Sequence, residues 1–283
     1  MPGLLFFVIF KYVPIYGIQL AFKNFVASLG IMGSPFIGLE HFQRLMGEPD
    51  FWNSILNTLI ISAMKLAVGF PVPIILTLLI NEIRSNKFKR FYQTIITIPH
   101  FLSWVIVSGI CFTLFASTGA INGLLTTFGF EKTDILTNPG SFRWLLVLTA
   151  VWKDAGWSTI LYLAALTSID KALYEAATID GANRFQKMLY ITIPGISEMI
   201  IVNLIMSMGH IMDGGFDQIF NMYNPAVLSV ADNIDTYVYR ISFEQTPNFG
   251  FSTAVGLFKG VCNMIMILVA DRVVKLFGRE GII

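Results

Sequence analysis

Residues 174–194 read YEAATIDGANRFQKMLYITIP, a polar stretch that lies between two strongly apolar blocks. The whole chain of 283 residues is 55% hydrophobic and only 13% charged, whereas soluble domains usually contain about 25% charged residues. The stretch is therefore a polar insert in a chain built mainly to lie in a membrane. We predict a single all-α domain over 1–283, a polytopic membrane protein surrounded by lipid.

Six apolar segments are long enough to cross the membrane, since a helix needs about 20 residues to span a hydrocarbon core of about 30 Å. They lie at 3–22, 54–80, 92–116, 143–167, 194–213 and 251–277. Pro71 and Pro73 predict a kink or tilt in the second segment. The first residues lack a basic region and a cleavage site, so we expect no signal peptide there; whether a cytoplasmic leader precedes them is left open.

The basic residues predict the orientation of the chain. The side that contains the second and fourth connections and the C-terminal end carries ten Lys and Arg residues, and the other side carries five. Because basic residues concentrate in cytoplasmic loops, we expect the polar insert and both termini to be cytoplasmic.

The insert over 168–193 predicts two short helices. Asp170 is a candidate cap for the first helix, and Asp180-Gly181 supplies a turn that tolerates positive φ. A second helix is expected over 183–190, and Pro194 suits the first turn of the fifth membrane helix. The paired alanines would let another surface approach closely, although an ordinary interfacial helix explains the physical pattern equally well.

One motif in the insert resembles the EAA loop of binding-protein-dependent ABC importer permeases: Glu175-Ala176-Ala177, three residues, Gly181, nine residues, and Ile191-Thr192-Ile193-Pro194. Ile193 departs from the leucine usual in that motif. The flanking LYEAATIDGA and the stretches YVPIYGIQLAFKNF, FWNSILNTLIIS and FKRFYQTIITIPHFLSWVIV resemble the maltose-type carbohydrate-uptake permeases, in particular LplB-like and YtcP-like members, with alginate importers among the candidates.

The resemblance implies the permease subunit of a type I ABC importer in the bacterial cytoplasmic (inner) membrane. It implies four kinds of partner: a second homologous permease, two ATPase subunits, an extracytoplasmic solute-binding protein, and an oligosaccharide or polysaccharide substrate. It also implies alternating access, with Glu175, Ala176, Ala177 and Gly181 on a coupling helix that docks to the ATPase. Whether the second permease is identical or different, and which sugar is carried, stay open.

Polar residues within the predicted spans are candidates for the substrate path, because charges at membrane depth tend to face a cavity or a partner. The fourth segment carries Trp152, Lys153, Asp154 and Trp157, which would suit sugar binding, or equally an aromatic belt with a structural ion pair. The fifth carries Asn203, Ser207 and His210 at spacings that place them on one helix face, which would line a path or pack against another helix. We assign no function to Lys65 or Glu198.

Other classes of function are less well supported. Scattered basic residues and a net charge of +1 give no nucleic-acid surface. Cys111 and Cys262 lie in apolar segments without a metal-binding or redox motif. The sequence has no Walker A motif and no catalytic motif, so we expect a chain that is not an enzyme and binds no cofactor, with ATP and Mg²⁺ on the partner ATPase. The main alternative is a self-contained secondary transporter or channel.

Overall fold

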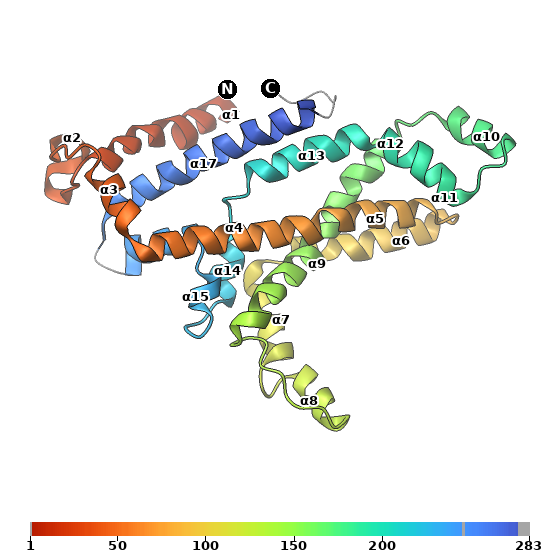
Figure 1. Cartoon of the computed structure of the whole chain (residues 1–283), viewed down its shortest axis with the longest axis horizontal. Helices are drawn as coiled ribbons and strands as arrows, with labels where there is room; N and C mark the ends of the chain where they lie inside the picture. The colour runs from red at the N-terminus through yellow and green to blue at the C-terminus, as the bar shows by residue number, and fades with distance from the viewer. Residues whose placement is uncertain (1, 245–246, 277–283) are drawn as a thin grey trace.

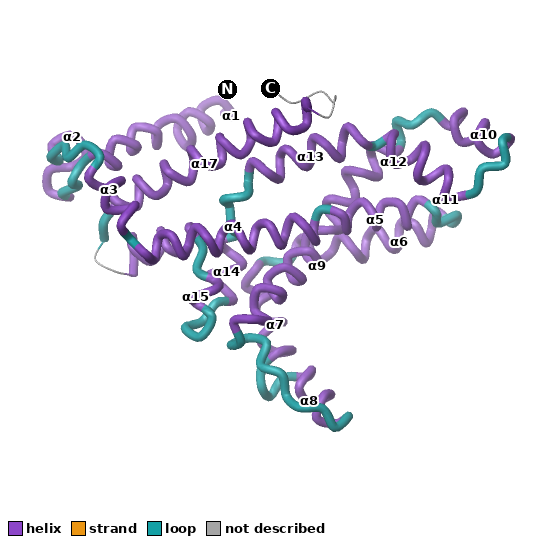
Figure 2. The backbone as a smooth tube through the Cα atoms, in the orientation of Figure 1, coloured by secondary structure: helices purple, strands orange, loops and turns teal. Residues whose placement is uncertain are grey.

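The computed structural model describes residues 2–244 and 247–276, and its regular secondary structure is helical (Figure 2). Within these ranges the β-type pairing is limited to an isolated antiparallel bridge between Lys23 and Phe36. The all-α prediction is confirmed. The long helices lie side by side in one body, from which the segment around α8, Ala120–Thr127, projects (Figure 1).

Four helical stretches are long and apolar enough to cross a membrane, and a fifth qualifies if a bent pair counts as one span. The four are Pro2–Phe22, Pro49–Asn81, Trp104–Thr127 and Phe249–Leu276. The bent pair is Arg184–Gly195 with Ser197–Gly209, at 57°. The remaining predicted segment coincides with α9, Pro139–Leu166, a continuous helix of 28 residues. This helix contains three charged residues, Arg143, Lys153 and Asp154.

The first and last spans pack together. The first consists of α1, Pro2–Phe7, followed by a π-helical turn (η1, Val8–Tyr12) and a 3₁₀ helix (η2, Val13–Phe22). The last is α17, Phe249–Leu276, which runs along η2 (Figure 1). After the first span, the chain continues through η3, Ala27–Leu29, and α2, Gly30–Gly33, to α3, Glu40–Gly47.

The second span consists of α4, Pro49–Gly69, and α5, Pro71–Asn81, which meet at Phe70. Phe70 keeps helical dihedrals, so the chain continues in the same course while Pro71 and Pro73 remove two backbone donors from the hydrogen-bond ladder. The proline interruption therefore falls where the sequence predicts it.

The third span differs from the straight helix expected over 92–116. It is divided into α6, Asn86–Thr97, a 3₁₀ turn (η4, Ile98–Phe101) and α7, Trp104–Phe115. Pro99 lies in the 3₁₀ turn, and Ser103 starts α7 as its N-cap, accepting a hydrogen bond from the Ile106 amide at 3.3 Å. A proline followed four residues later by a capping serine ends one helix and begins another.

Helix α9 is central to the packing, and it contacts α4, α5, α6 and η4. The side chains of Ile61, Val107, Leu146 and Ile219 form part of one core cluster there, each at most 1% exposed. Gly156 allows an unusually close helix crossing, because a Cβ at this position would overlap the carbonyl oxygen of Ile96. The glycine is thus required for the contact between α9 and α6.

The segment between the last two spans folds over the end of α4 and α9. It contains α14, Phe216–Met222, α15, Leu228–Ala231, α16, Ile234–Tyr239, and η6, Arg240–Glu244. Arg143 Nη2 donates to Asn57 Oδ1 at 2.7 Å, and Arg143 Nε donates to the Val230 carbonyl at 3.1 Å. The first bond joins α9 to α4, and the second attaches the segment to α9.

The polar insert lies at one end of the molecule. Its helices α10, Lys171–Ile179, and α11, Arg184–Lys187, lie at the same end as the connection from α5 to α6, and α2 and α3 lie at the opposite end (Figure 1). Arg184 Nη1 is 3.6 Å from Glu82 Oε2, which links the insert to the end of α5. Two of the connections rich in basic residues thus share one end of the molecule.

Candidate functional site

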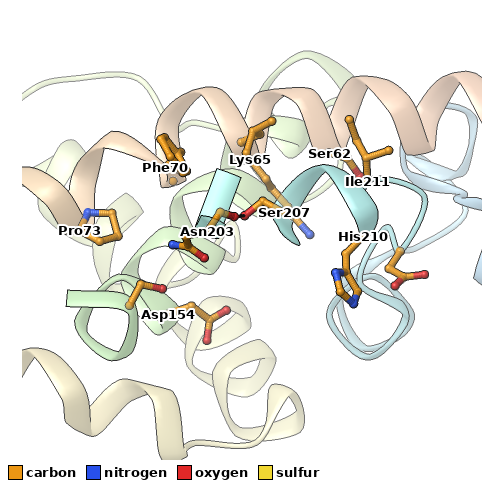
Figure 3. A pocket seen from close by; sticks show the side chains of 13 residues that line it. Ser62, Lys65, Phe70, Pro73, Asp154, Asn203, Ser207, His210 and Ile211 are labelled. Carbon is orange, nitrogen blue, oxygen red and sulfur yellow. Dashed lines mark hydrogen bonds between the residues drawn. The ribbon is translucent and has the colours of Figure 1, made fainter. Parts of the chain in front are cut away.

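A cavity of about 410 Å³ lies between α4, the start of α5, α9 and α13, Ser197–Gly209 (Figure 3). Its volume is within the range of about 300–1,000 Å³ usual for small-molecule sites. It is lined by Ser62, Lys65, Leu66, Gly69, Phe70, Pro73, Asp154, Ser158, Asn203, Ser207, His210, Ile211 and Asp213. The lining combines four helices and is rich in hydroxyl, amide and charged groups.

Helix α13 and its C-terminal cap, His210, contribute the three polar residues predicted to share a face. Asn203, Ser207 and His210 all line the cavity, so the prediction of a common face is confirmed (Figure 3). Asn203 Nδ2 donates to Tyr162 Oη at 2.7 Å, and Ser207 Oγ donates to the Asn203 carbonyl at 2.7 Å. His210 Nδ1 is 2.8 Å from the Met206 carbonyl, an acceptor, so this nitrogen carries a proton. The other ring nitrogen, Nε2, is then available to a ligand.

Of the four candidates on α9, the cavity is lined by Asp154 alone. Asp154 Oδ1 is 3.0 Å from His100 Nδ1 and 3.8 Å from Lys153 Nζ. Lys153 is 7% exposed and points away from the cavity toward η4, where it donates to the His100 carbonyl at 2.7 Å. It also lies 5.5 Å from the centre of the Trp104 ring. Lys153 thus satisfies a carbonyl that the broken third span leaves without a helical partner.

The two candidate tryptophans on α9, Trp152 and Trp157, do not line this cavity. Trp157 is stacked on His100 with 4.7 Å between ring centroids, and it is 45% exposed. Trp152 is 50% exposed and lies on the stripe that also carries Trp144 and Leu148. Spacing along α9 explains the position of residues 152 and 153, which occupy other faces of the helix than residue 154. Trp157, three residues after Asp154, lies beside it, and both side chains contact His100.

Lys65, to which we assigned no function from the sequence, faces the cavity from α4 (Figure 3). Its Nζ donates to the carbonyl of Gly214 at 3.3 Å. The sequence feature that could have identified this role is a lone cation in an apolar segment. Lys65 lies three or four residues from Ser62 and Gly69, and Pro73 follows at the next such interval, so all four lie on the same helix face. The sequence does not show which other helices this face contacts.

The first helix of the polar insert has the predicted ends. Asp170 caps α10, with its carboxylate accepting from the Ala172 amide at 2.9 Å. At the other end the Gly181 amide donates to the Thr178 carbonyl at 3.2 Å, and the Ala182 amide donates to the Ala177 carbonyl at 2.9 Å. Gly181 has φ +78°. This pair of bonds around a left-handed glycine is the Schellman arrangement.

The candidate coupling residues lie on an accessible surface. Glu175, Ala176 and Gly181 are exposed, and Ala177 is half-buried. The same end carries large exposed apolar side chains at Leu173, Ile179, Phe185 and Tyr190. Exposed apolar groups of this size around small residues are typical of a protein interface.

The second half of the insert differs from the prediction. The helix that starts at α11 does not stop at residue 190 but continues through a π-helical turn (η5, Met188–Thr192) into α12, Ile193–Gly195. Pro194 therefore lies near the end of this helix, and α13 begins after the bend at Ile196. The π-helical turn changes the hydrogen-bonding pattern just before the proline, which has no amide proton to donate. Helix α13 ends at Gly209, four residues before the predicted boundary.

A second cavity, of about 430 Å³, lies at the opposite end from the insert and is lined by Arg44, Glu48, Asp50, Tyr237, Arg240, Ile241, Pro247, Asn248 and Phe251. Arg240 Nη2 is 2.7 Å from Asp232 Oδ2. Burial, followed by the nearby charges of Glu48 and Asp50, raises the pKa of Tyr237 to about 12. Its hydroxyl therefore keeps its proton at neutral pH and can donate a hydrogen bond.

The chain is similar to permeases of known transport systems. The family model described as "Binding-protein-dependent transport system inner membrane component" matches residues 69–280. The polygalacturonan/rhamnogalacturonan transport system permease protein YteP of Bacillus subtilis (strain 168) is 47% identical over all of this chain and 88% of its own length. Protein LplB of the same organism is 44% identical over all of this chain and 89% of its own length.

A solved structure supports the same relationship. A chain in the crystal structure of a bacterial alginate ABC transporter, in complex with alginate pentasaccharide-bound periplasmic protein, superposes with a TM-score of 0.90. It is 38% identical, and the match covers 99% of this chain and 94% of that one. The two chains therefore share the ABC importer permease fold along nearly their whole length. This chain belongs to the family of binding-protein-dependent transport system inner membrane components.

Proposed function

We propose that this chain forms one half of the membrane path of an ABC importer for an oligosaccharide or polysaccharide. The observation that carries the proposal is a direct structural connection between the two candidate sites. The exposed insert continues through α11, η5 and α12 into α13, whose Asn203 and Ser207 form a wall of the cavity. A movement of the insert would therefore act on the cavity through two successive helices joined by the bend at Ile196.

The nature of the cargo is supported by the relatives and by the lining. YteP is named for polygalacturonan and rhamnogalacturonan, and AraP of Bacillus subtilis, 29% identical over 87% of this chain, for arabinooligosaccharides. Hydroxyl, amide and imidazole groups, which Ser62, Asn203 and His210 provide here, are suited to hydrogen-bonding sugar hydroxyls. Asn203, Ser207, His210 and Asp154 are the residues that we place on the sugar path.

The proposed assembly contains a second permease, two ATPase subunits that bind ATP and Mg²⁺, and a solute-binding protein outside the cell. Glu175, Ala176, Ala177 and Gly181 would contact an ATPase subunit, with Leu173 and Ile179 adding apolar contact area. The second cavity lies at the other end, where the solute-binding protein would dock. Both termini would be cytoplasmic, on the side of the insert, in agreement with the distribution of basic residues.

Reconstitution tests the proposal against a secondary transporter. The complete complex in proteoliposomes should take up sugar only with enclosed ATP and external loaded binding protein, and this chain alone should hydrolyse no ATP. Sugar uptake by this chain alone, driven by an ion gradient without ATP, would contradict the importer proposal. Trp152→Ala changes an exposed residue outside the cavity and is a suitable control for losses during preparation of a variant complex.

A further inference from the structure

Lys65 is an isolated cation at the wall of the cavity. It extends from α4, a helix of otherwise mainly apolar residues, and its Nζ points into the space facing α13 (Figure 3). Its hydrogen bond to the Gly214 carbonyl is 3.3 Å long, slightly beyond the usual range of N–H···O bonds. No salt bridge joins Lys65 to a carboxylate among residues 2–244 and 247–276. An ammonium group has three donors, so Lys65 can accept a further partner.

The two carboxylates that line the cavity already have cationic partners. Asp154 contacts His100 and Lys153, at 3.0 and 3.8 Å. Asp213 is 2.7 Å from Lys259 Nζ, which also lies 2.6 Å from Asp235. The field of Asp154 reaches Lys65, but the carboxylate is held on the far side of the cavity by its own partners. Lys65 therefore adds a positive charge that the protein does not pair.

An unpaired cation at membrane depth is costly, and such residues usually serve a ligand or a relay. The remaining polar lining consists of the His210 imidazole and of hydroxyls and an amide at Ser62, Ser158, Asn203 and Ser207. One cation among neutral donors and acceptors matches one anionic group on a molecule rich in hydroxyls. With Asp154 in the same cavity, a monoanionic carboxylate is better accommodated than a dianionic phosphate, because repulsion increases with charge.

We propose that Lys65 binds the carboxylate of a uronate residue, so that this cavity selects acidic over neutral oligosaccharides. The inference rests on the proposed function, since it requires that sugar enters this cavity. The ammonium group would move from its long bond with Gly214 to a charge-assisted hydrogen bond with the sugar carboxylate. Asn203, Ser207 and His210 Nε2 would bind ring hydroxyls from the opposite side.

The test measures sugar binding to the complete transporter in lipid nanodiscs without its binding protein, so that the selectivity of the binding protein does not enter. The probes are trigalacturonate and its fully methyl-esterified form, which has the same rings but no charge. Calorimetry should show that the wild type binds the acid at least about tenfold more tightly, as expected for one charge-assisted hydrogen bond. Lys65→Met should weaken acid binding by roughly tenfold to hundredfold and change ester binding less than about twofold.

Two further variants serve as controls, one for the charge at position 65 and one for the effect of preparing a lysine variant of the complex. Lys65→Arg keeps the charge and should retain a preference for the acid. Lys132→Met removes an exposed lysine far from the cavity along the chain and should match the wild type. Recovery of the ATPase with each variant reports assembly, and the comparison of acid with ester in the wild type does not depend on any variant.

The possible results distinguish the role of Lys65 from the assignment of the cavity to the sugar path. Equal binding of acid and ester by the wild type, or an unchanged preference in Lys65→Met, would overturn the role of Lys65 while the cavity keeps its proposed place on the sugar path. Binding of neither probe to the wild type would overturn both the role of Lys65 and the assignment of this cavity to the sugar path.

Discussion

The hydroxyl of Tyr174 lies 3.0 Å from Oγ1 of Thr192, so the first helix of the polar insert is bonded directly to the π-helical turn that leads into the membrane. Thr192 is buried and Tyr174 is half-buried. Lys187 Nζ adds a second connection, to Thr178 Oγ1 at 2.7 Å. The two halves of the insert are therefore linked through side chains as well as through the turn at Gly181.

Tyr174→Phe should uncouple the insert from the membrane helices without removing the insert. The substitution deletes one hydrogen bond, worth about 0.5–1.5 kcal/mol. We expect normal recovery of the ATPase with the permease and a several-fold lower stimulation of ATP hydrolysis by loaded binding protein. Tyr190→Phe, at a hydroxyl-bearing side chain that is 73% exposed, is the matched control. Equal stimulation in both variants would argue against a mechanical role for the Tyr174 bond.

Gly181→Asp should disrupt the contact with the ATPase far more than the membrane fold. Gly181 has φ +78°, where a side chain costs about 1 kcal/mol or somewhat more, but no atom lies within 4 Å of a Cβ placed there. The folded permease alone can therefore accommodate the aspartate. The measurement is the amount of ATPase that copurifies with the permease pair, relative to the amount of the pair itself.

Gly181→Ala serves as the control for that variant, because it adds the backbone cost without the charged side chain. We expect it to retain most of the ATPase. A complex of Gly181→Asp that contains normal ATPase and normal stimulated hydrolysis would make the insert an ordinary interfacial helix.

Ala177→Asp should have a similar effect through a different cause. Ala177 is half-buried on α10, and an aspartate there would place an unpaired charge in the proposed interface. Loss of copurifying ATPase, with normal yield of the permease pair, is the expected result. Asp180→Ala, which removes a charge at an exposed position three residues further on, provides a comparison for charge alone.

Gly156→Ala should prevent stable folding. Its Cβ would overlap backbone atoms at Ile96 and Thr97, and backbone cannot move aside as a flexible side chain can. Overpacking of this kind costs typically about 1–3 kcal/mol or more, so the yield of folded permease and its thermal transition in detergent should both fall. Gly109→Ala, on α7, meets no atom within 4 Å and should leave both unchanged.

His210→Ala should lower sugar transport while the complex assembles normally. His210 lines the cavity, and its Nδ1 is held by Met206, so the variant removes a ligand group and only one local hydrogen bond. The measurement is ATP-dependent uptake in proteoliposomes at matched complex content. Transport equal to that of the wild type would make His210 a packing residue and shift the sugar path away from α13.

The sequence predicted the parts of this molecule that depend on local pattern. Spans appear as long apolar runs, and the turn at Gly181 and the cap at Asp170 follow from residue types whose conformational preferences are strong. The break in the third span was missed because the apolar run continues through Pro99, and hydropathy does not register the proline. The continuation of α11 past residue 190 was missed for a related reason, since a π-helical turn has no clear sequence signal.

The site was predicted only within single helices. Asn203 and Ser207 share a face because helix geometry requires it, and His210, which caps the helix, lines the same cavity. Lys65 bonds to Gly214 and lines a cavity that α13 also lines, and both lie far from Lys65 in the sequence. Trp157 and Asp154 were grouped by proximity along the chain, and both contact His100, a residue that the break in the third span brings to α9. Tertiary contacts of this kind cannot be inferred from one helix at a time.

The 57° bend at Ile196 makes the helix from Arg184 to Gly209 a lever with two arms. Ile196 is 1% exposed, and a Cβ at Gly195 would collide with the side chain of Ile169, so the elbow is packed against the end of the fourth span. In the proposed importer, a push by the ATPase on the first arm, Arg184–Gly195, would turn into a sideways swing of the second arm, Ser197–Gly209, about this bend. The second arm carries Asn203 and Ser207, which line the cavity, so such a swing would change the width of the cavity without unwinding any helix.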